Sequence, residues 1–193
     1  MPFIAFLGCD GSGKSAVIQR VSEHLKSEGH AVTLGHWCPK MKSDAASQSA
    51  AATDNPHGQK ARGIVTSLLK LGWLLMKWRL AWAQRLGAAS RNGYVIFDRY
   101  HGDLLVDPIR YRYGGSLGLA WVIHKLMPQP DHVIFLDAEP DVLLSRKQEV
   151  SREALEKGRM AYRQAGERLR GFVEVDAGVE LERVVSKVLK IIQ

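Results

Sequence analysis

Five short strand-like runs recur along the chain, separated by helix-length segments, and the runs that end at Asp98 and Asp137 are nearly continuous in apolar residues. The runs are FIAFL (3–7), HAVTLGHW (30–37), YVIFD (94–98), HVIFLD (132–137) and FVEVD (172–176). Continuous apolar character is typical of strands that are covered on both faces. Because parallel neighbours need long crossovers, strands that alternate with helix-length segments predict a parallel sheet wrapped by helices. The pattern therefore predicts the α/β class.

Helical periodicity follows the first run. Val17, Val21 and Leu25 recur on one face of a helix predicted over 16–26, and Gly29 ends it. The long segment 41–62 has no apolar period and is rich in Ser and Ala, which predicts a surface loop. Two interpretations of this loop stay open: a disordered insertion, or a flap on the substrate side. A length of 193 residues with 46% hydrophobic content fits one domain over residues 1–193.

A second helix is predicted over 64–83, where the chain is apolar for about the length of a membrane span. Lys70, Lys77 and Arg79 interrupt it, which disfavours membrane insertion. The predicted core stripe is Ile64, Leu68, Leu71, Leu75, Trp78 and Trp82, and the predicted polar face is Ser67, Lys70, Lys77 and Gln84. Leu69, Trp73 and Leu74 widen the stripe. The helix is expected either to pack on the core alone or also to form a dimer interface.

Charge and cysteine content add weaker constraints. The formal net charge of +7 is compatible with nucleic acid, an anionic membrane or phosphorylated small ligands as partners. Cys9 and Cys38 lack metal-ligand spacing and are expected to be free thiols in a reducing compartment. The start MPFIAFLG has no basic leader, so a cytoplasmic location is expected.

A glycine-rich turn follows the first predicted strand and precedes the first predicted helix. Gly8, Gly13, Lys14 and Ser15 match G-x-x-x-x-G-K-[ST], the phosphate-binding loop. Its backbone N–H groups surround the β-phosphate, its lysine binds the β- and γ-oxygens, and its hydroxyl ligates Mg²⁺. We therefore expect ATP and Mg²⁺ as cofactors. The expected nucleotide-binding residues are Gly8, Asp10, Gly11, Ser12, Gly13, Lys14, Ser15 and Ala16.

The run VIFDRY delivers Asp98 and Arg99 to the carboxyl end of a strand, where α/β sheets bind ligands. Asp98 is expected to hold magnesium or to orient the acceptor, and Arg99 to clamp the acceptor's phosphate bidentately. Asp137 ends a similar strand without a following cation, and we expect it to be structural. An N-K-x-D guanine-reading element is absent from the sequence, which disfavours a GTPase switch.

The segment 145–171 is strongly basic. It carries eight Lys or Arg against four Glu, and Arg152, Arg159 and Arg163 share one helical face. Such a segment can close over transferring phosphates as a kinase lid, with Lys14, Asp98, Arg99, Arg152 and Arg159 as the expected catalytic set. The alternative for any one arginine is a solvated helix with i,i+3 or i,i+4 ion pairs. Tyr162 is the only aromatic among these cations, so nucleic-acid binding is not expected.

Taken in order, GCDGSGKS, YVIFDRY, PDHVIFLDAEPDVLLSRK and FVEVDAGVELERVVSKVLKII resemble the thymidylate kinase family over most of the chain. The resemblance implies a three-layer P-loop kinase fold with five parallel strands in the order 2-3-1-4-5 and a basic C-terminal lid. It also implies that Lys14 and Ser15 bind ATP and Mg²⁺, and that Asp10 approaches the sugar hydroxyl of the acceptor. A homodimer that pairs through a helix in the tryptophan-bearing region is implied as well.

The acceptor half departs from the family pattern. HWCPK (36–40) stands where the family has R-E-P-G-G, and HGDLLVDPIRYRYGG (101–115) follows the D-R-Y motif. The expected acceptor is a nucleoside monophosphate, dTMP first, and the expected acceptor-binding residues are Asp10, Trp37, Arg99, Tyr100, Asp103 and Arg110. One alternative is a sugar, glycan or other metabolite, with Asp103 and Asp107 accepting hydrogen bonds from hydroxyls and Trp37 or Tyr111 stacking on the sugar. Another is a nucleotide-binding switch or scaffold without kinase activity.

Overall fold

The sheet has the predicted composition and order. The computed structural model describes residues 1–39, 63–148 and 151–193. Five strands pair in parallel in the order β2-β3-β1-β4-β5, so the α/β prediction and the implied strand order are confirmed. The strands are β1 (Phe3–Leu7), β2 (Ala31–His36), β3 (Gly93–Asp98), β4 (His132–Asp137) and β5 (Phe172–Asp176).

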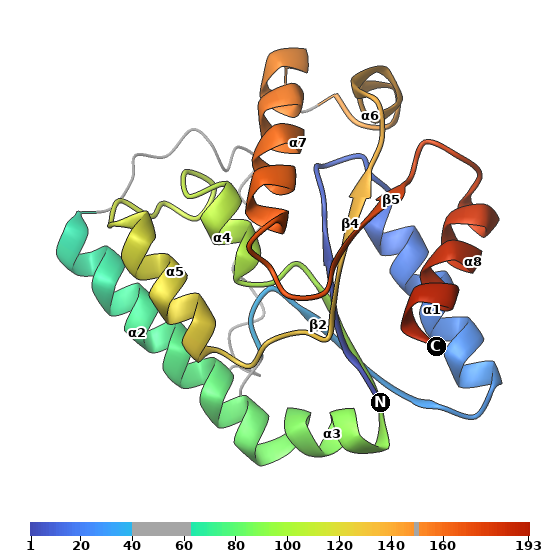
Figure 1. Ribbon diagram of the computed structural model, residues 1–193, viewed down its shortest axis with the longest axis horizontal. Coiled ribbons are helices and arrows are strands. Elements are labelled where there is room, and N and C mark those ends of the chain that lie inside the picture. Colours follow the sequence, from blue (N-terminus) through green and yellow to red (C-terminus); the bar gives the residue numbers. More distant parts are fainter. Residues whose placement is uncertain (40–62, 149–150) are drawn as a thin grey trace.

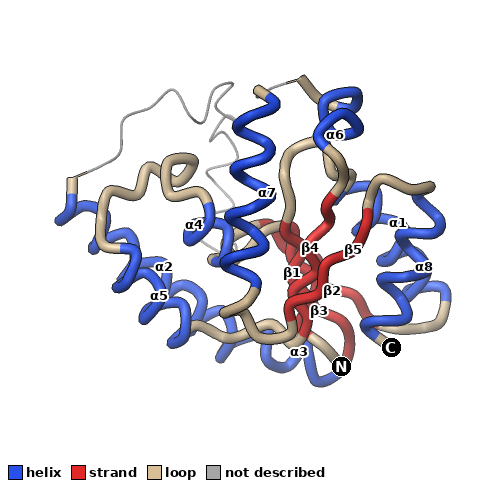
Figure 2. Tube along the Cα trace, turned by 45° about the horizontal axis from the view of Figure 1, so that its top comes forward, coloured by secondary structure: helices blue, strands red, loops and turns tan. Residues whose placement is uncertain are grey.

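Helices cover both faces of this sheet and complete three layers (Figure 1). Figure 2 shows the strands as the middle layer between the two groups of helices. The helices are α1 (Lys14–Ser27), α2 (Ile64–Ala81), the π-helical η2 (Trp82–Leu86), α3 (Gly87–Asn92), α4 (Gly102–Val106), α5 (Leu117–Leu126), α6 (Pro140–Arg146), α7 (Arg152–Gly166) and α8 (Leu181–Ile192).

Strand β1 is buried along its whole length because it feeds two cores. Ile4 and Phe6 point toward α1 and α8, whereas Phe3, Ala5 and Leu7 point toward the layer that contains α2. This double coverage explains why the run FIAFL contains no polar position. A fully apolar run is therefore the correct signal for a central strand of this sheet.

The predicted orientation of the long helix is wrong in part. Leu71 and Trp78 of α2 are buried as predicted, but Ile64 and Leu68 are exposed, and Ser67 and Lys77 are buried instead. Ser67 faces inward because its Oγ accepts a hydrogen bond from the Gly114 backbone N–H at 2.9 Å. The Lys77 ammonium lies 4.5 Å from the Trp73 ring centre, a cation–π contact that favours its position on that side.

The carboxyl ends of the strands form the edge at which the predicted site residues gather. In the register of β1 and β3, Phe6 pairs with Asp98, so the loop after β1 lies beside the end of β3. The predicted loop 41–62 lies outside the described residues, and α7 accounts for most of the predicted lid. Within the described ranges, no helix combines the length and apolar character that a membrane span requires.

Candidate active site

The glycine-rich loop after β1 needs its glycines for backbone reasons. Gly8, Gly11 and Gly13 have φ values of 149°, 85° and 80°, which disfavour any residue with a Cβ. A Cβ on Gly8 would also lie 2.6 Å from the Leu136 carbonyl oxygen, and one on Gly11 would lie 2.7 Å from that of Leu143. The loop thus folds tightly against the end of β4 and against α6, and α1 begins at Lys14.

The Lys14 side chain lies inside this loop. Its ammonium donates hydrogen bonds to the carbonyl oxygens of Gly8 and Cys9, both at 2.9 Å, and to Ser12 Oγ at 3.2 Å. Burial, assisted by the positive charge of Arg99, lowers the pKa of Lys14 to about 8. The lysine is held in place by the loop itself, at the wall of a cavity of about 440 Å³.

This cavity has a strongly positive lining and is called the phosphate cavity below. Its walls carry five cationic side chains against two carboxylates. The residues that line it are Asp10, Gly11, Gly13, Lys14, Ser15, Ala16, His36, Asp98, Arg99, Arg110, Arg146 and Lys147. Most of the predicted nucleotide-binding residues are therefore brought together, whereas Gly8 and Ser12 lie outside this wall. Gly8 lines a neighbouring cavity, and Ser12 is buried beneath the loop.

Asp98 lies at the end of β3, in a position suited to binding a cation. Its Oδ1 atom is buried and has no hydrogen-bond partner, although an unpaired buried carboxylate oxygen is unfavourable. Ser15 lines the same cavity from the first turn of α1. No group of three His, Cys, Asp or Glu side chains in the described segments forms a complete metal site. The pair therefore fits Mg²⁺, which takes few protein ligands and completes its shell with water and phosphate oxygens.

Asp10 joins two arginines at the acceptor side of the phosphate cavity. Its Oδ1 accepts from Arg99 Nη2 at 2.6 Å, and its Oδ2 accepts from Arg110 Nη1 at 2.8 Å. Burial opposes the ionisation of Asp10, but the hydrogen bond from Arg110 and the charges of both arginines lower its pKa to about 2. Arg110 is in turn oriented by Asp107, whose Oδ1 accepts from the Arg110 backbone N–H at 3.0 Å. Two guanidinium groups thus face one cavity.

A second cavity of about 330 Å³ adjoins the first and shares Asp10 and Arg110 with it. Its remaining lining is mostly apolar and comes from the loop after β1, the segment 106–109 and one side of α7. These residues are Gly8, Cys9, Val106, Asp107, Ile109, Ala154, Leu155, Lys157, Gly158, Ala161 and Tyr162. It is called the apolar cavity below.

Three of the predicted acceptor-binding residues do not face either cavity. Tyr100 is 1% exposed and packs among Phe3 and Trp78, with its hydroxyl donating to the Pro128 carbonyl oxygen. Asp103 is also 1% exposed, and protein donors occupy both of its oxygens. Both side chains point into the protein, so the predicted contact of Tyr100 and Asp103 with the acceptor finds no support in these positions.

The Trp37 ring also contacts protein side chains rather than either cavity. Its ring stacks on that of Tyr111, with centres 4.9 Å apart and planes 16° apart, and the Lys70 ammonium lies 5.5 Å from the Trp37 ring centre. The predicted stacking of Trp37 or Tyr111 on an acceptor is replaced by their stacking on each other. Trp37 has a φ of 45°, so the end of β2 is held in an uncommon conformation by this contact.

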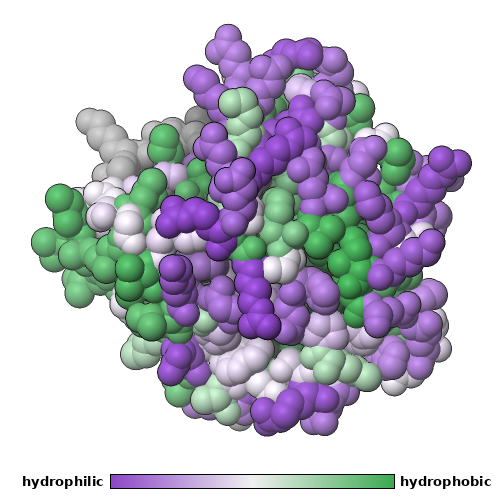
Figure 3. Space-filling model, viewed as in Figure 1, coloured by the Kyte–Doolittle hydropathy of each residue, from purple (hydrophilic) through white to green (hydrophobic). Residues whose placement is uncertain are grey.

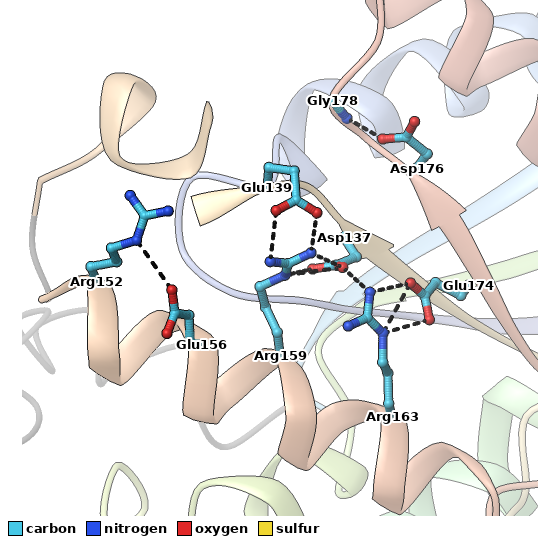
Figure 4. A network of polar contacts seen from close by, with 9 residues as sticks. All are labelled: Asp137, Glu139, Arg152, Glu156, Arg159, Arg163, Glu174, Asp176 and Gly178. Atoms are coloured by element: carbon cyan, nitrogen blue, oxygen red, sulfur yellow. Dashed lines mark hydrogen bonds and ion pairs between the residues drawn. The ribbon is translucent and has the colours of Figure 1, made fainter. Parts of the chain in front are cut away.

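Arg152 and Arg159, predicted to be catalytic, bind carboxylates away from the phosphate cavity (Figure 4). Arg152 is exposed and pairs with Asp141 and Glu156. The Arg159 guanidinium donates to Asp137, with Nε 2.8 Å from Oδ1, and to Glu139, with Nη2 2.9 Å from Oε1. Asp137 is thus structural as expected. The catalytic role predicted for the two arginines does not fit these positions, because carboxylates of the β4 end and α6 neutralise them.

Sequence reasoning missed Arg146, Lys147 and His36 as residues of the phosphate cavity. Arg146 and Lys147 lie at the end of α6, and Arg146 Nη1 donates to the Ala177 carbonyl oxygen at 2.9 Å. Their signal in the sequence is the adjacent basic pair Arg146-Lys147, which a charge count over the whole basic segment does not single out. Tyr162 was noted only as an aromatic, yet it lines the apolar cavity.

The chain is similar to known proteins both in sequence and in fold. The chain matches the family model described as Thymidylate kinase over residues 6–188. It is 28% identical to probable thymidylate kinase 1 of Saccharolobus solfataricus, over 98% of this chain and 96% of that protein. The probable thymidylate kinase of Archaeoglobus fulgidus is 26% identical, over 98% of this chain and 94% of its own. The solved thymidylate kinase from Ehrlichia chaffeensis has a TM-score of 0.66 at 18% identity, covering 100% of this chain and 98% of that one, so the fold is shared.

Proposed function

The chain belongs to the thymidylate kinase family, and on that premise we propose that it transfers the γ-phosphoryl group of ATP to a nucleoside monophosphate, with dTMP as acceptor. The observation that carries the proposal is the lining of the phosphate cavity, where five cationic side chains meet two carboxylates. A surplus of fixed positive charge on opposite sides of one cavity suits two phosphate-bearing ligands, because phosphoryl transfer is accelerated mainly by positioning and charge stabilisation.

The donor half consists of the loop after β1, the start of α1 and the end of α6. Lys14 exchanges its three hydrogen bonds within the loop for the β- and γ-oxygens of ATP, and the loop amides surround the β-phosphate. Ser15 and Asp98 are the residues that would hold Mg²⁺, which when bound neutralises charge on the transferring phosphates. Arg146 and Lys147 add two further cations to the same wall.

The acceptor half consists of Arg99, Arg110 and Asp10. The two guanidinium groups bind the phosphate monoester, for which their fork geometry is suited, and orient one of its oxygens toward the γ-phosphorus. The nucleoside part of the acceptor then occupies the apolar cavity, which meets the phosphate cavity at Asp10 and Arg110. Asp10 is ionised, and its oxygens face the boundary of the two cavities, where a sugar hydroxyl of the acceptor donates to them.

Neither alternative function is favoured. For the sugar or glycan kinase, the expected residues were Asp103, Asp107, Trp37 or Tyr111. Asp103, Trp37 and Tyr111 bind one another or other protein groups. Asp107 lines the apolar cavity, but its Oδ1 accepts from the Arg110 backbone N–H. A switch or scaffold does not need the pair Arg99 and Arg110 in the same cavity as Asp98. The curated relatives that match almost the whole chain are named as thymidylate kinases, which also supports a nucleotide acceptor.

We further propose that the enzyme is a homodimer that pairs through α2. This helix exposes Val65, Leu69 and Met76 at 70%, 69% and 56% of their surfaces. Apolar side chains gather over α2 and α5 in Figure 3, at the side of the molecule away from α8. An exposed apolar face of this extent is uncommon on a monomer and suits a second copy of the chain. Cys9 and Cys38 are free thiols, which suits the reducing cytoplasm that we propose as the location of the protein.

The direct test is a coupled assay of ADP release with ATP, Mg²⁺ and a panel of nucleoside monophosphates. We expect saturation with dTMP at a KM of at most about millimolar. Arg99→Ala and Arg110→Ala should each raise the KM for dTMP or lower kcat by about tenfold or more, since each removes a charged donor to its phosphate. Asp141→Asn, an exposed change on α6, serves as the control. Background turnover with every monophosphate, together with intact ATP binding, would reject the proposal.

A further inference from the structure

Asp103 binds Arg99, one of the two arginines proposed for the acceptor's phosphate, and accepts hydrogen bonds from three separate parts of the fold. Its Oδ2 accepts from Arg99 Nη1 at 2.7 Å and from the Tyr111 hydroxyl at 3.2 Å. Its Oδ1 accepts from the Tyr162 hydroxyl at 2.8 Å. The donors come from the end of β3, the segment between α4 and α5, and α7. With 1% exposure, Asp103 acts on ligands only through these partners.

Arg99 is held at both ends of its guanidinium. Nη1 binds the buried Asp103, and Nη2 binds Asp10 at the cavity wall. The residue also has a φ of 67°, an uncommon conformation for a side chain with a Cβ that the surrounding structure must stabilise. When an acceptor's phosphate binds Arg99, its contact with Asp10 is the one that changes, because only Asp10 faces the cavity. Asp103 then remains the fixed anchor.

We propose that Asp103 is a positioning residue: its carboxylate fixes the Arg99 guanidinium for the acceptor's phosphate and joins that arginine to α7. This inference rests on the proposed function. It assigns to Asp103 an indirect role, in place of the direct acceptor contact that the sequence indicated.

The chemistry of the partners requires a charged carboxylate at this position. Arg99 and the two phenols are donors toward Asp103, so an amide in its place would turn an NH₂ group toward one of them. Burial, together with the negative charge of Asp103, raises the pKa of Tyr162 and of Tyr111 well above the usual value. Both hydroxyls therefore stay protonated and continue to donate.

The contact with Tyr162 extends the effect of Asp103 to the second cavity. Tyr162 is 5% exposed, stacks on Phe135 of β4 and lines the apolar cavity from α7. One carboxylate thus sets both the arginine for the acceptor's phosphate and a wall of the cavity proposed for its nucleoside. Loss of this carboxylate should impair acceptor use more than ATP use, because Lys14 makes its hydrogen bonds within the loop and feels Asp103 only as one of several nearby charges.

The first experiment compares steady-state kinetics of Asp103→Asn with the unchanged enzyme. We expect the KM for the acceptor to rise, or kcat to fall, by about tenfold or more, while the KM for ATP changes by less than about twofold. In an Arg99→Ala background the same substitution should lose most of its effect and keep only the part that acts through Tyr162. Equal losses for ATP and acceptor, or full multiplication of the two effects, would show a merely structural role and overturn the inference.

The second experiment needs no acceptor and separates this inference from the proposed function. Guanidinium resonances of Arg99, assigned by their loss in Arg99→Lys, should be resolved in nitrogen-15 NMR spectra because two carboxylates block rotation. Asp103→Asn should broaden them, and Asp141→Asn should not. If Asp103→Asn does not fold, Asp103→Ser, which also removes the carboxylate that Arg99 Nη1 binds, must broaden them. Resolved resonances that persist in these variants refute the inference even if dTMP is phosphorylated. Absence of turnover with any monophosphate, with the broadening observed, refutes only the proposed function.

Discussion

The ion-pair cluster around Asp137 predicts a large and specific loss of stability on Asp137→Asn. Asp137 is 5% exposed and its oxygens lie 2.7 to 3.1 Å from nitrogens of Arg159 and Arg163 (Figure 4). The substitution keeps the size of the side chain and removes its charge. Arg159 would keep Glu139 at 2.9 Å, and Arg163 would keep Glu174 at 2.8 Å.

The magnitude follows from burial. Removing one partner of a buried ion pair costs about 3–5 kcal/mol, because the remaining charge stays desolvated. Both arginines keep a second carboxylate, so we expect the lower end, about 3 kcal/mol. For 193 residues at about 2.1 cal/mol/K each, the unfolding entropy is about 0.4 kcal/mol/K, and the melting temperature should fall by about 7 °C.

Thermal melts followed by circular dichroism, with urea unfolding as a second measure, test this prediction. Asp141→Asn is the matched control, because it removes a carboxylate that also binds an arginine of α7 but is 74% exposed, and its melting temperature should not change measurably. Arg159→Met should reproduce the loss, and combining it with Asp137→Asn should add little. A melting temperature for Asp137→Asn within about 1 °C of the unchanged protein would refute the reasoning.

Three further predictions concern the nucleotide, the dimer and acid sensitivity. Lys14→Ala should weaken ATP binding by about a hundredfold in calorimetry, since it removes a charged donor to the phosphates; unchanged affinity would contradict the donor site. Light scattering should give the mass of two chains for the unchanged protein and the mass of one chain for Leu69→Glu. If both proteins are monomers at micromolar concentration, the dimer proposal is overturned. Burial lowers the pKa of His101 to about 3 and the pKa of His124 to about 4. Below pH 6.5 the unfolded state therefore binds more protons than the folded state. Stability to urea should therefore fall between pH 6.5 and pH 4, less so in His124→Gln, and an identical pH dependence of the two proteins would count against this.

The fold was predictable because its central strands are buried on both faces. The runs at β1, β3 and β4 are apolar enough to be found without any partner, and the glycine motif needs only its local context. Asp98 and Arg99 were found for the same reason, because they directly follow such a run.

The side-chain partners of the site could not be predicted, since they are distant in sequence. Ser67 turns inward to meet Gly114, and Arg159 binds Asp137 and Glu139 instead of a phosphate. Composition shows that a segment is basic, but not which carboxylates neutralise it. The same limit applies to Asp103, whose burial depends on Tyr162 of α7.

The two arginines proposed for the acceptor's phosphate, and the side chains that orient them apart from Asp10, lie on one continuous stretch. Arg99, Asp103, Arg110 and Tyr111 all lie between the end of β3 and the start of α5, whereas Lys14 and Ser15 lie on a different segment. Substrate range can therefore diverge by exchange of this stretch without altering the machinery that binds ATP. A chimaera that carries residues 99–111 of this chain in a relative would also need a tyrosine at the position of Tyr162. The Tyr162 hydroxyl of α7 donates the hydrogen bond that Asp103 of this stretch accepts.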